Sequence, residues 1–175
     1  MPKNRFLPLC LFLAGVFSFE LAYAVEKIGM EIPEKALNAP IYELPDLQGN
    51  IIQTPGKGGW TLMNFWATYC GPCRNEMPAL NRLHSEMGKT GLAVQTIALD
   101  GDRQSAVRKF KERFKLELPI LLDNGTGISR EFSVSALPVS FLVNEKGVVV
   151  GRFVGERDWD SGEFKQFLSN KVLNN

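Results

Sequence analysis

Short apolar runs separated by polar turns divide the chain into segments with the length of buried strands. The clearest run is Thr61-Leu62-Met63-Asn64-Phe65-Trp66, which is mostly apolar. Continuous runs of about four to eight such residues are typical of strands buried on both faces. Residues 92–99, 119–122, 139–143 and 148–154 are predicted to be extended as well. The last two flank Asn144-Glu145-Lys146-Gly147, which predicts a tight turn between antiparallel strands.

Apolar positions at helical spacing predict helices between these strands. Residues 73–88 form the longest such segment, with the repeating positions Met77, Leu80, Leu83, His84 and Met87. Residues 105–115 carry a second apolar face, made of Val107, Phe110 and Phe114. Residues 128–132 are expected to form one or two helical turns, and residues 160–173 a closing helix.

The order of these elements predicts the fold class. Strands and helices alternate first, and a hairpin and a helix then end the chain, which favours an α/β sandwich with a mixed sheet. Upstream, residues 41–54 contain short apolar stretches around Leu47-Gln48-Gly49-Asn50, which predicts a further hairpin turn.

The N-terminus has the features of a targeting segment. Lys3 and Arg5 precede an almost wholly apolar run, residues 6–19, and Ala22-Tyr23-Ala24 matches a signal peptidase site. We expect residues 1–24 to be a signal peptide cleaved after Ala24. An uncleaved membrane anchor is the alternative, although a membrane-spanning helix needs about 20 apolar residues. Residues 25–38 are interpreted as a linker, and residues 39–175 as one folded domain.

Charge and cysteine content narrow the function. The formal net charge is only +1, and nothing in the sequence suggests a nucleic-acid partner. Once a leader containing Cys10 is removed, only Cys70 and Cys73 remain. A disulfide between them closes a very small loop, so it stabilises the chain little through chain entropy. The pair is therefore interpreted as a reactive dithiol.

The two cysteines lie where a predicted strand gives way to a predicted helix. The first turn of a helix has unpaired N–H groups and the positive end of the dipole, which favour an anion. Cys70 is therefore the candidate attacking thiolate, and Pro72 suits the first turn because it has no N–H. Cys73 lies one turn further on and is the candidate resolving thiol. The alternatives are a structural disulfide or half of a metal site, but His84 is the only histidine, and we predict no metal.

Glu76 is the third candidate catalytic residue. It lies three positions after Cys73, on the same face of the predicted helix. A carboxyl partly buried beside two sulfurs has a raised pKa and can exchange a proton with Cys73. The alternative is that Glu76 is only an acid placed favourably in the first turn of a helix.

At the level of motifs, Phe65-Trp66-Ala67-Thr68-Tyr69-Cys70-Gly71-Pro72-Cys73 resembles the active-site signature of the thioredoxin superfamily. Cys73-Arg74-Asn75-Glu76-Met77-Pro78 and Ser135-Ala136-Leu137-Pro138-Val139-Ser140-Phe141 resemble its exported TlpA/ResA-like branch. The similarity extends from about Ala39 to Lys171. It implies a thioredoxin-like three-layer α/β/α sandwich with an N-terminal β-hairpin extension.

The resemblance also implies roles for individual residues. It implies a cis Leu137–Pro138 bond beside the cysteines, with Leu137 and Pro138 contacting substrate. Trp66 is interpreted as a core residue that can also flank the sulfurs and contact substrate. Tyr69 is a further candidate substrate contact, and it stands where the family usually has tryptophan. Thioredoxin has a buried aspartate at the place of Asn64, so the acid–base role is left to Glu76, which matches a glutamate of ResA-like proteins.

The function expected from these features is thiol–disulfide exchange in the periplasm without any cofactor. The favoured form is a reductase for disulfides of exported proteins, of the cytochrome c maturation or copper-site assembly type. It implies a membrane thiol electron donor, exported protein thiols as substrates, and a monomer. Two alternatives remain open at this point, namely a thiol oxidase or isomerase and a non-enzymatic Cu(I)-binding module, since two thiolates suit Cu(I).

Overall fold

The computed structural model describes residues 25–172, with side chains up to residue 170. The predicted signal peptide and Cys10 lie outside the described residues. The chain divides into two compact units, residues 1–30 and residues 31–175. In the described part of the first unit, the Met30 N–H donates to the Val25 carbonyl at 3.1 Å and closes a short helical turn. The part of the chain that the structure describes contains no helix long and apolar enough to cross a membrane.

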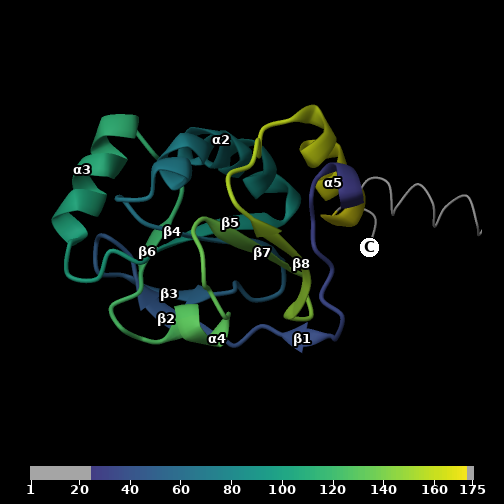
Figure 1. Cartoon of the computed structure of the whole chain (residues 1–175), viewed down its shortest axis with the longest axis horizontal. Helices are drawn as coiled ribbons and strands as arrows, with labels where there is room; N and C mark the ends of the chain where they lie inside the picture. The colour runs from purple at the N-terminus through teal and green to yellow at the C-terminus, as the bar shows by residue number, and fades with distance from the viewer. Residues whose placement is uncertain (1–24, 173–175) are drawn as a thin grey trace, which may run out of the picture. The chain divides into compact units, whose positions relative to one another are not determined.

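The second unit is built on a six-stranded sheet in the order β1-β8-β7-β4-β5-β6. The strands are β1 (Leu37–Asn38), β4 (Trp60–Trp66), β5 (Leu92–Ala98), β6 (Ile120–Leu122), β7 (Val139–Val143) and β8 (Val148–Val154). Strands β4, β5 and β6 are parallel, whereas β7 pairs antiparallel with both β4 and β8. The mixed sheet predicted from the order of elements is confirmed (Figure 1).

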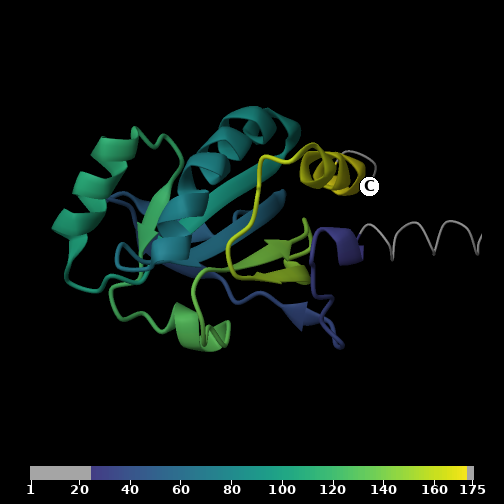
Figure 2. The same cartoon turned by 45° about the horizontal axis from the view of Figure 1, so that its top comes forward.

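Helices and a hairpin cover the two faces of this sheet. Three helices lie on one face, namely α2 (Gly71–Met87), α3 (Gln104–Phe114) and α5 (Gly162–Val172). The other face carries α4 (Ile128–Glu131) and the antiparallel pair β2 (Tyr42–Pro45) and β3 (Ile51–Thr54). Figures 1 and 2 show these layers, which form the thioredoxin-like α/β fold with the expected N-terminal hairpin. A short 3-10 helix, η1 (Gly88–Thr90), follows α2.

Successive side chains of β4 point to opposite faces of the sheet. Phe65 packs against Phe132 and Phe141, with ring centroids 5.5 Å and 5.9 Å apart, on the face with α4. Trp66 packs against Phe110 of α3 on the opposite face, with the centroids 5.1 Å apart. Because both faces are covered, every residue of β4 is buried, which explains why its sequence does not alternate between apolar and polar.

One expectation differs from the structure. The segment interpreted as a linker, residues 25–38, contributes to the sheet, because Leu37 and Asn38 pair with Val149 and Val148. Within the same segment, Glu31 forms an isolated bridge with Arg152. These contacts cover the outer edge of β8, so the folded unit begins upstream of residue 39.

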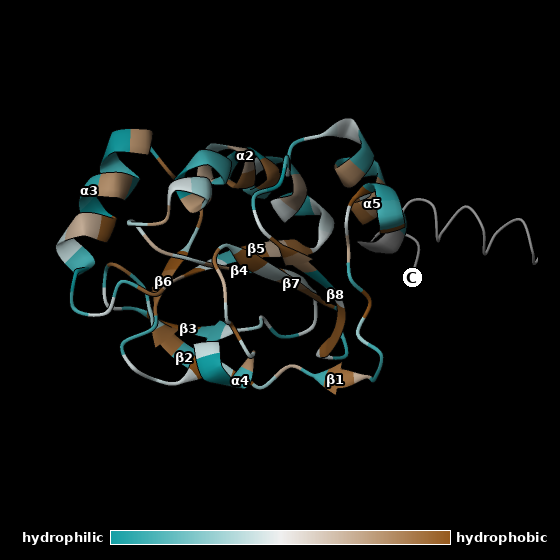
Figure 3. Cartoon of the chain, in the orientation of Figure 1, coloured by the Kyte–Doolittle hydropathy of each residue, from teal (hydrophilic) through white to brown (hydrophobic). Residues whose placement is uncertain are grey.

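The apolar face predicted for α3 is present, and the ring of Phe114 packs against Phe110 with centroids 4.6 Å apart. The residues of α3 alternate between hydrophobic and hydrophilic along the helix (Figure 3), and Val107 and Phe110 are buried as predicted. Phe114 is 41% exposed, since the helix ends there and Lys115 turns the chain with a positive φ of 49°. The apolar face of α3 is therefore buried at Val107 and Phe110 and partly exposed at its last residue.

Candidate active site

Helix α2 begins at the cysteine pair. Cys70 is its N-cap residue, with an extended backbone, and its Sγ accepts a hydrogen bond from the Cys73 N–H at 3.2 Å. Pro72 lies in the first turn, where its missing N–H costs nothing. The helix therefore starts at Gly71, two residues earlier than expected, and one of its unpaired N–H groups points at a sulfur.

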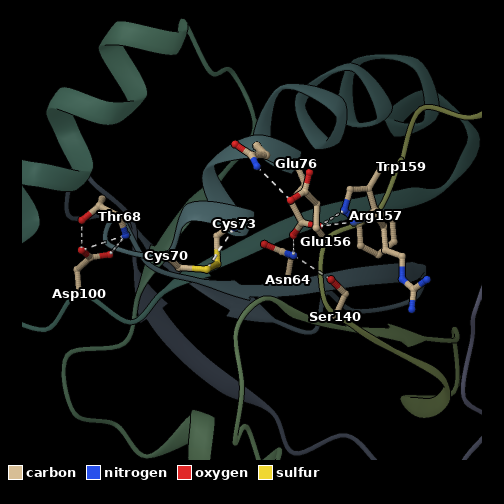
Figure 4. The surroundings of a disulfide bond; sticks show 11 residues. Asn64, Thr68, Cys70, Cys73, Glu76, Asp100, Ser140, Glu156, Arg157 and Trp159 are labelled. Carbon is tan, nitrogen blue, oxygen red and sulfur yellow. Dashed lines mark hydrogen bonds between the residues drawn. A yellow bond between two sulfur atoms is a disulfide. The ribbon is translucent and has the colours of Figure 1, made fainter.

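The two sulfurs form a disulfide and differ in exposure. Cys70 and Cys73 are joined with an S–S distance of 2.04 Å (Figure 4). Cys70 is partly exposed, whereas Cys73 is fully buried between α2 and the sheet. Only Cys70 is therefore accessible to a large partner, while Cys73 is shielded from it.

Glu76 lies one turn after Cys73 and is almost completely buried, with 2% of its surface exposed. Its Oε1 accepts a hydrogen bond from Asn64 Nδ2 at 2.7 Å. Its Oε2 accepts two more, from Trp159 Nε1 at 2.9 Å and from the backbone N–H of Arg157 at 3.0 Å. Figure 4 shows this carboxyl between β4 and the segment that precedes α5.

Burial raises the pKa of Glu76 to about 7. The hydrogen bonds from Trp159, Asn64 and Arg157 lower this pKa, because each favours the ionised form, but the loss of hydration outweighs them. The nearby charge of Glu156 adds to the increase. The expectation that Glu76 is buried and has a raised pKa is thus confirmed, and its carboxyl can bind or release a proton near neutral pH.

Several groups that surround Glu76 and Asn64 are not evident from the sequence alone. Trp159 lies 83 positions after Glu76, in a segment without a recognisable motif. Ser140 accepts a hydrogen bond from Asn64 Nδ2 at 2.9 Å. Ser140 and Asn64 did carry a signal, because each is a polar residue inside an otherwise apolar strand, and buried polar groups need partners.

The proline motif is at the end of β4, as the resemblance implied. Val139 pairs with Phe65, so Leu137 and Pro138 lie beside the segment that leads from β4 into Cys70. The Leu137–Pro138 bond is cis, as expected, and a second cis bond, Thr54–Pro55, was not anticipated. Pro138 is buried and Leu137 partly exposed, which leaves Leu137 accessible to a substrate.

Trp66 and Tyr69 have opposite environments. Trp66 is fully buried against Phe110, so it belongs to the core and not to a surface that a substrate contacts. The placement of Trp66 in the substrate site is corrected accordingly. Tyr69 is 60% exposed, and the guanidinium of Arg103 lies over its ring at 4.7 Å.

Asp100 holds the segment before Cys70 in place. Its carboxylate accepts hydrogen bonds from the Thr68 N–H, at 3.0 Å to Oδ2, and from the Thr68 hydroxyl. Arg103 approaches the same carboxylate at 3.8 Å. Sequence reasoning missed Asp100, since nothing in the pattern links the end of β5 to Thr68. Within the described residues no group of three or more His, Cys, Asp or Glu side chains is arranged to hold a metal ion.

Comparison with known proteins gives consistent results. The AhpC/TSA family matches residues 36–152. A thiol-disulfide oxidoreductase ResA of Bacillus cereus is 37% identical over 164 residues, which cover 90% of this chain and 92% of that protein. The thioredoxin-like protein YneN of Bacillus subtilis is 34% identical over 152 residues, covering 84% of this chain and 86% of the other.

Solved structures agree with this assignment. A structure assigned as the thiol:disulfide interchange protein DsbE of Chlorobium tepidum has a TM-score of 0.70 and 28% identity, over 79% of this chain and 98% of that chain. StoA from Bacillus subtilis has a TM-score of 0.64 and 27% identity, over 71% of this chain and 95% of the other. The chain therefore belongs to the AhpC/TSA family and is one of its thioredoxin-like thiol–disulfide oxidoreductases.

Proposed function

We propose that this protein reduces disulfides in exported proteins, using Cys70 as the attacking thiol and Cys73 as the resolving thiol. The observation that carries the proposal is the contrast between a partly exposed sulfur at a helix N-terminus and a buried sulfur one turn behind it. The Cys73 N–H that reaches Cys70 Sγ stabilises a thiolate there in the reduced protein.

The exchange proceeds in two steps. The Cys70 thiolate attacks one sulfur of the client disulfide, a mixed disulfide forms, and the displaced client thiolate takes up a proton. Cys73 then loses its proton and attacks Cys70 Sγ, which closes the Cys70–Cys73 disulfide and releases the second client thiol. The client gains two electrons and two protons, and the protein loses two electrons, the Cys73 proton and the proton that Cys70 released to solvent when it ionised.

Glu76 is the acid–base group of the second step in this proposal. Its carboxyl is buried one turn from Cys73 and has a pKa of about 7, so it can take the Cys73 proton at neutral pH. It then passes the proton to the departing client thiolate or to water. Leu137 and Tyr69 form the client contact around Cys70, and the buried Pro138 supports the Leu137 backbone, which offers an edge to an extended peptide.

The setting of the reaction is also part of the proposal. The charged start, apolar run and Ala22-Tyr23-Ala24 motif of the N-terminus support export to the periplasm, with cleavage after Ala24. A reductant in that compartment is regenerated by a membrane thiol donor. The clients are proteins whose cysteines must be reduced before they receive a cofactor, of the apocytochrome c or copper-site type. The Gly71-Pro72 dipeptide resembles that of the reducing protein thioredoxin.

The reduction potential of the Cys70–Cys73 pair tests the direction of this reaction. The protein is equilibrated with glutathione buffers, and the dithiol fraction is measured by alkylation and mass spectrometry. We expect a potential near that of thioredoxin, about −270 mV. A potential near about −120 mV, which is typical of a strong oxidant, would make the protein an oxidase and contradict the proposal. Cys73→Ser is the control, because it can form only mixed disulfides.

A further inference from the structure

The amide nitrogen of the Asn64 side chain has hydrogen-bond partners among the described residues, whereas the amide oxygen has none. Asn64 lies in β4 and is completely buried. Its Nδ2 donates to Glu76 Oε1 at 2.7 Å and to Ser140 Oγ at 2.9 Å. Its Oδ1 is also buried, but it has no hydrogen-bond partner among the residues that the structure describes. A buried acceptor left without a donor costs free energy, so this oxygen calls for an explanation.

The direction of that oxygen suggests its partner. In Figure 4 the nitrogen of Asn64 points toward Glu76 and Ser140, whereas its oxygen points to the side of the disulfide. Cys73 is buried on α2 one turn before Glu76, the residue that Asn64 contacts. In the disulfide, Cys73 Sγ carries no hydrogen and cannot donate. In the reduced protein it carries an S–H, which is a weak donor.

We propose that the side-chain carbonyl of Asn64 accepts a hydrogen bond from the Cys73 thiol when the pair is reduced. An external dithiol opens the Cys70–Cys73 bond and is itself oxidised to a disulfide, and it supplies two electrons and two protons. One of these protons resides on Cys73 Sγ, and this S–H points at Asn64 Oδ1. Asn64 is thus a positioning residue, which orients the resolving thiol on one side and the Glu76 carboxyl on the other.

Asn64 also favours the dithiol form in this proposal. The disulfide form alone carries a buried Oδ1 without a donor, and reduction removes that cost. The inference rests on opening and closing of the Cys70–Cys73 pair, and it holds whichever direction the protein works in. A potential that contradicts the reductase proposal therefore leaves this inference intact.

Infrared spectroscopy of the S–H stretching band tests the hydrogen bond directly. Cys10 and Cys70 are replaced by alanine in the full chain, so that Cys73 is the sole thiol. We expect the Cys73 band to lie at lower frequency in the folded protein than in the same chain unfolded in denaturant. An equal frequency in the folded and unfolded states would overturn the proposal. This comparison needs no substitution of Asn64.

Two further variants identify the acceptor. In the same background, Asn64→Leu has a similar size and no acceptor, so the band should move to higher frequency. Ser140→Ala removes a partner of Nδ2 but leaves Oδ1 intact, so the lowered frequency should persist. A band that stays low in Asn64→Leu would assign the thiol to another acceptor and refute the role of Asn64. If Asn64→Leu does not fold, Asn64→Asp retains an acceptor oxygen and should retain the lowered frequency, and loss of it would equally refute the role.

Discussion

Glu76 combines features that rarely coexist in one carboxyl group. Burial disfavours its ionised form, yet the three N–H donors around it suit a carboxylate, which only accepts hydrogen bonds. These opposing effects leave the pKa at about 7, so neither form dominates at neutral pH. A group in this balance exchanges protons readily, which is what resolution of a mixed disulfide requires.

Replacing Glu76 with Gln tests this role in the reaction. The amide has nearly the same size but cannot take the Cys73 proton. We expect the mixed disulfide to form at the rate of the unmodified protein, because the proposed mechanism assigns that step to Cys70. Its resolution should slow by on the order of 100-fold, the usual contribution of a general base. Stopped-flow measurement with a disulfide peptide separates the two steps.

Glu156 provides the matched control. It is an exposed carboxylate that affects Glu76 through its charge, and its Oε2 accepts a hydrogen bond from Asn75 at 3.1 Å. Glu156→Gln should change the resolution rate little. Equal resolution rates in Glu76→Gln and the unmodified protein would remove Glu76 from the mechanism.

The raised pKa of Glu76 also makes the stability of the disulfide form depend on pH. Its folded pKa, about 7, lies above the ordinary 4.5, so the folded protein binds the proton more tightly than the unfolded chain does. The resulting stabilisation is complete below about pH 4.5 and is lost as the pH rises through about 7. Each unit of difference between the folded and unfolded pKa values corresponds to about 1.4 kcal/mol, so the lost stabilisation is on the order of 3 kcal/mol.

Urea unfolding of the oxidised protein across this range measures the effect. The difference in free energy of unfolding between the unmodified protein and Glu76→Gln isolates the contribution of this carboxyl, since all other groups titrate in both proteins. As the pH rises from about 4.5 to about 7, we expect the unmodified protein to lose stability relative to Glu76→Gln. Parallel pH curves would show that the Glu76 pKa is not raised.

At the scale of elements, α2 is held at its start and along its middle. Its first turn is capped by Cys70. Further along, Asn81 Oδ1 accepts hydrogen bonds from the backbone N–H groups of Glu117 at 2.7 Å and Leu118 at 3.1 Å. Arg82 forms an exposed ion pair with Asp160 on the segment before α5. The helix thus connects two segments that approach the sheet from different parts of the sequence.

The two neighbouring residues of α2 should contribute differently to stability. Asn81→Ala leaves two backbone N–H groups without their acceptor, and we expect a loss of about 1–2 kcal/mol in the free energy of unfolding. Asn81→Asp keeps the acceptor and should recover much of this loss. Arg82→Ala removes only an exposed ion pair and should have a smaller effect. Denaturant unfolding of the three variants checks the order, and a larger effect of Arg82→Ala would contradict it.

At the scale of the whole molecule, the mixed sheet brings the parts of the site together. The end of β4, the first turn of α2 and the segment before β7 meet because β4 pairs with β7 through Phe65 and Val139. The segment before α5 reaches Glu76 through Trp159. This residue packs in an aromatic cluster with Phe153 and Phe164, at centroid distances of 5.3 Å and 4.9 Å. The same cluster therefore closes the fold and delivers a donor to the buried carboxyl.

Local sequence patterns were sufficient to predict many of the helices, strands and turns of this molecule. The apolar run of β4, the spacing of α2 and the Asn144–Gly147 turn depend on residues close in sequence, and each was predicted to within a few positions. Sequence patterns did not predict burial correctly where it depends on residues that are distant in the sequence. Trp66 lies next to the cysteine motif in the sequence and was included among the substrate contacts, but it is buried against Phe110 of α3. Leu37 and Asn38 become a strand only because the edge of β8 is available.

By itself, the amino-acid sequence determined which reactive groups this protein has and that two thiols lie within one turn at a helix start, because capping and spacing are local properties. Only the tertiary structure decided how those groups behave. The Glu76 pKa depends on burial and on donors from Asn64, Arg157 and Trp159, up to 83 positions away. Hydration is lost only when distant segments close over a group, so no local pattern can encode it.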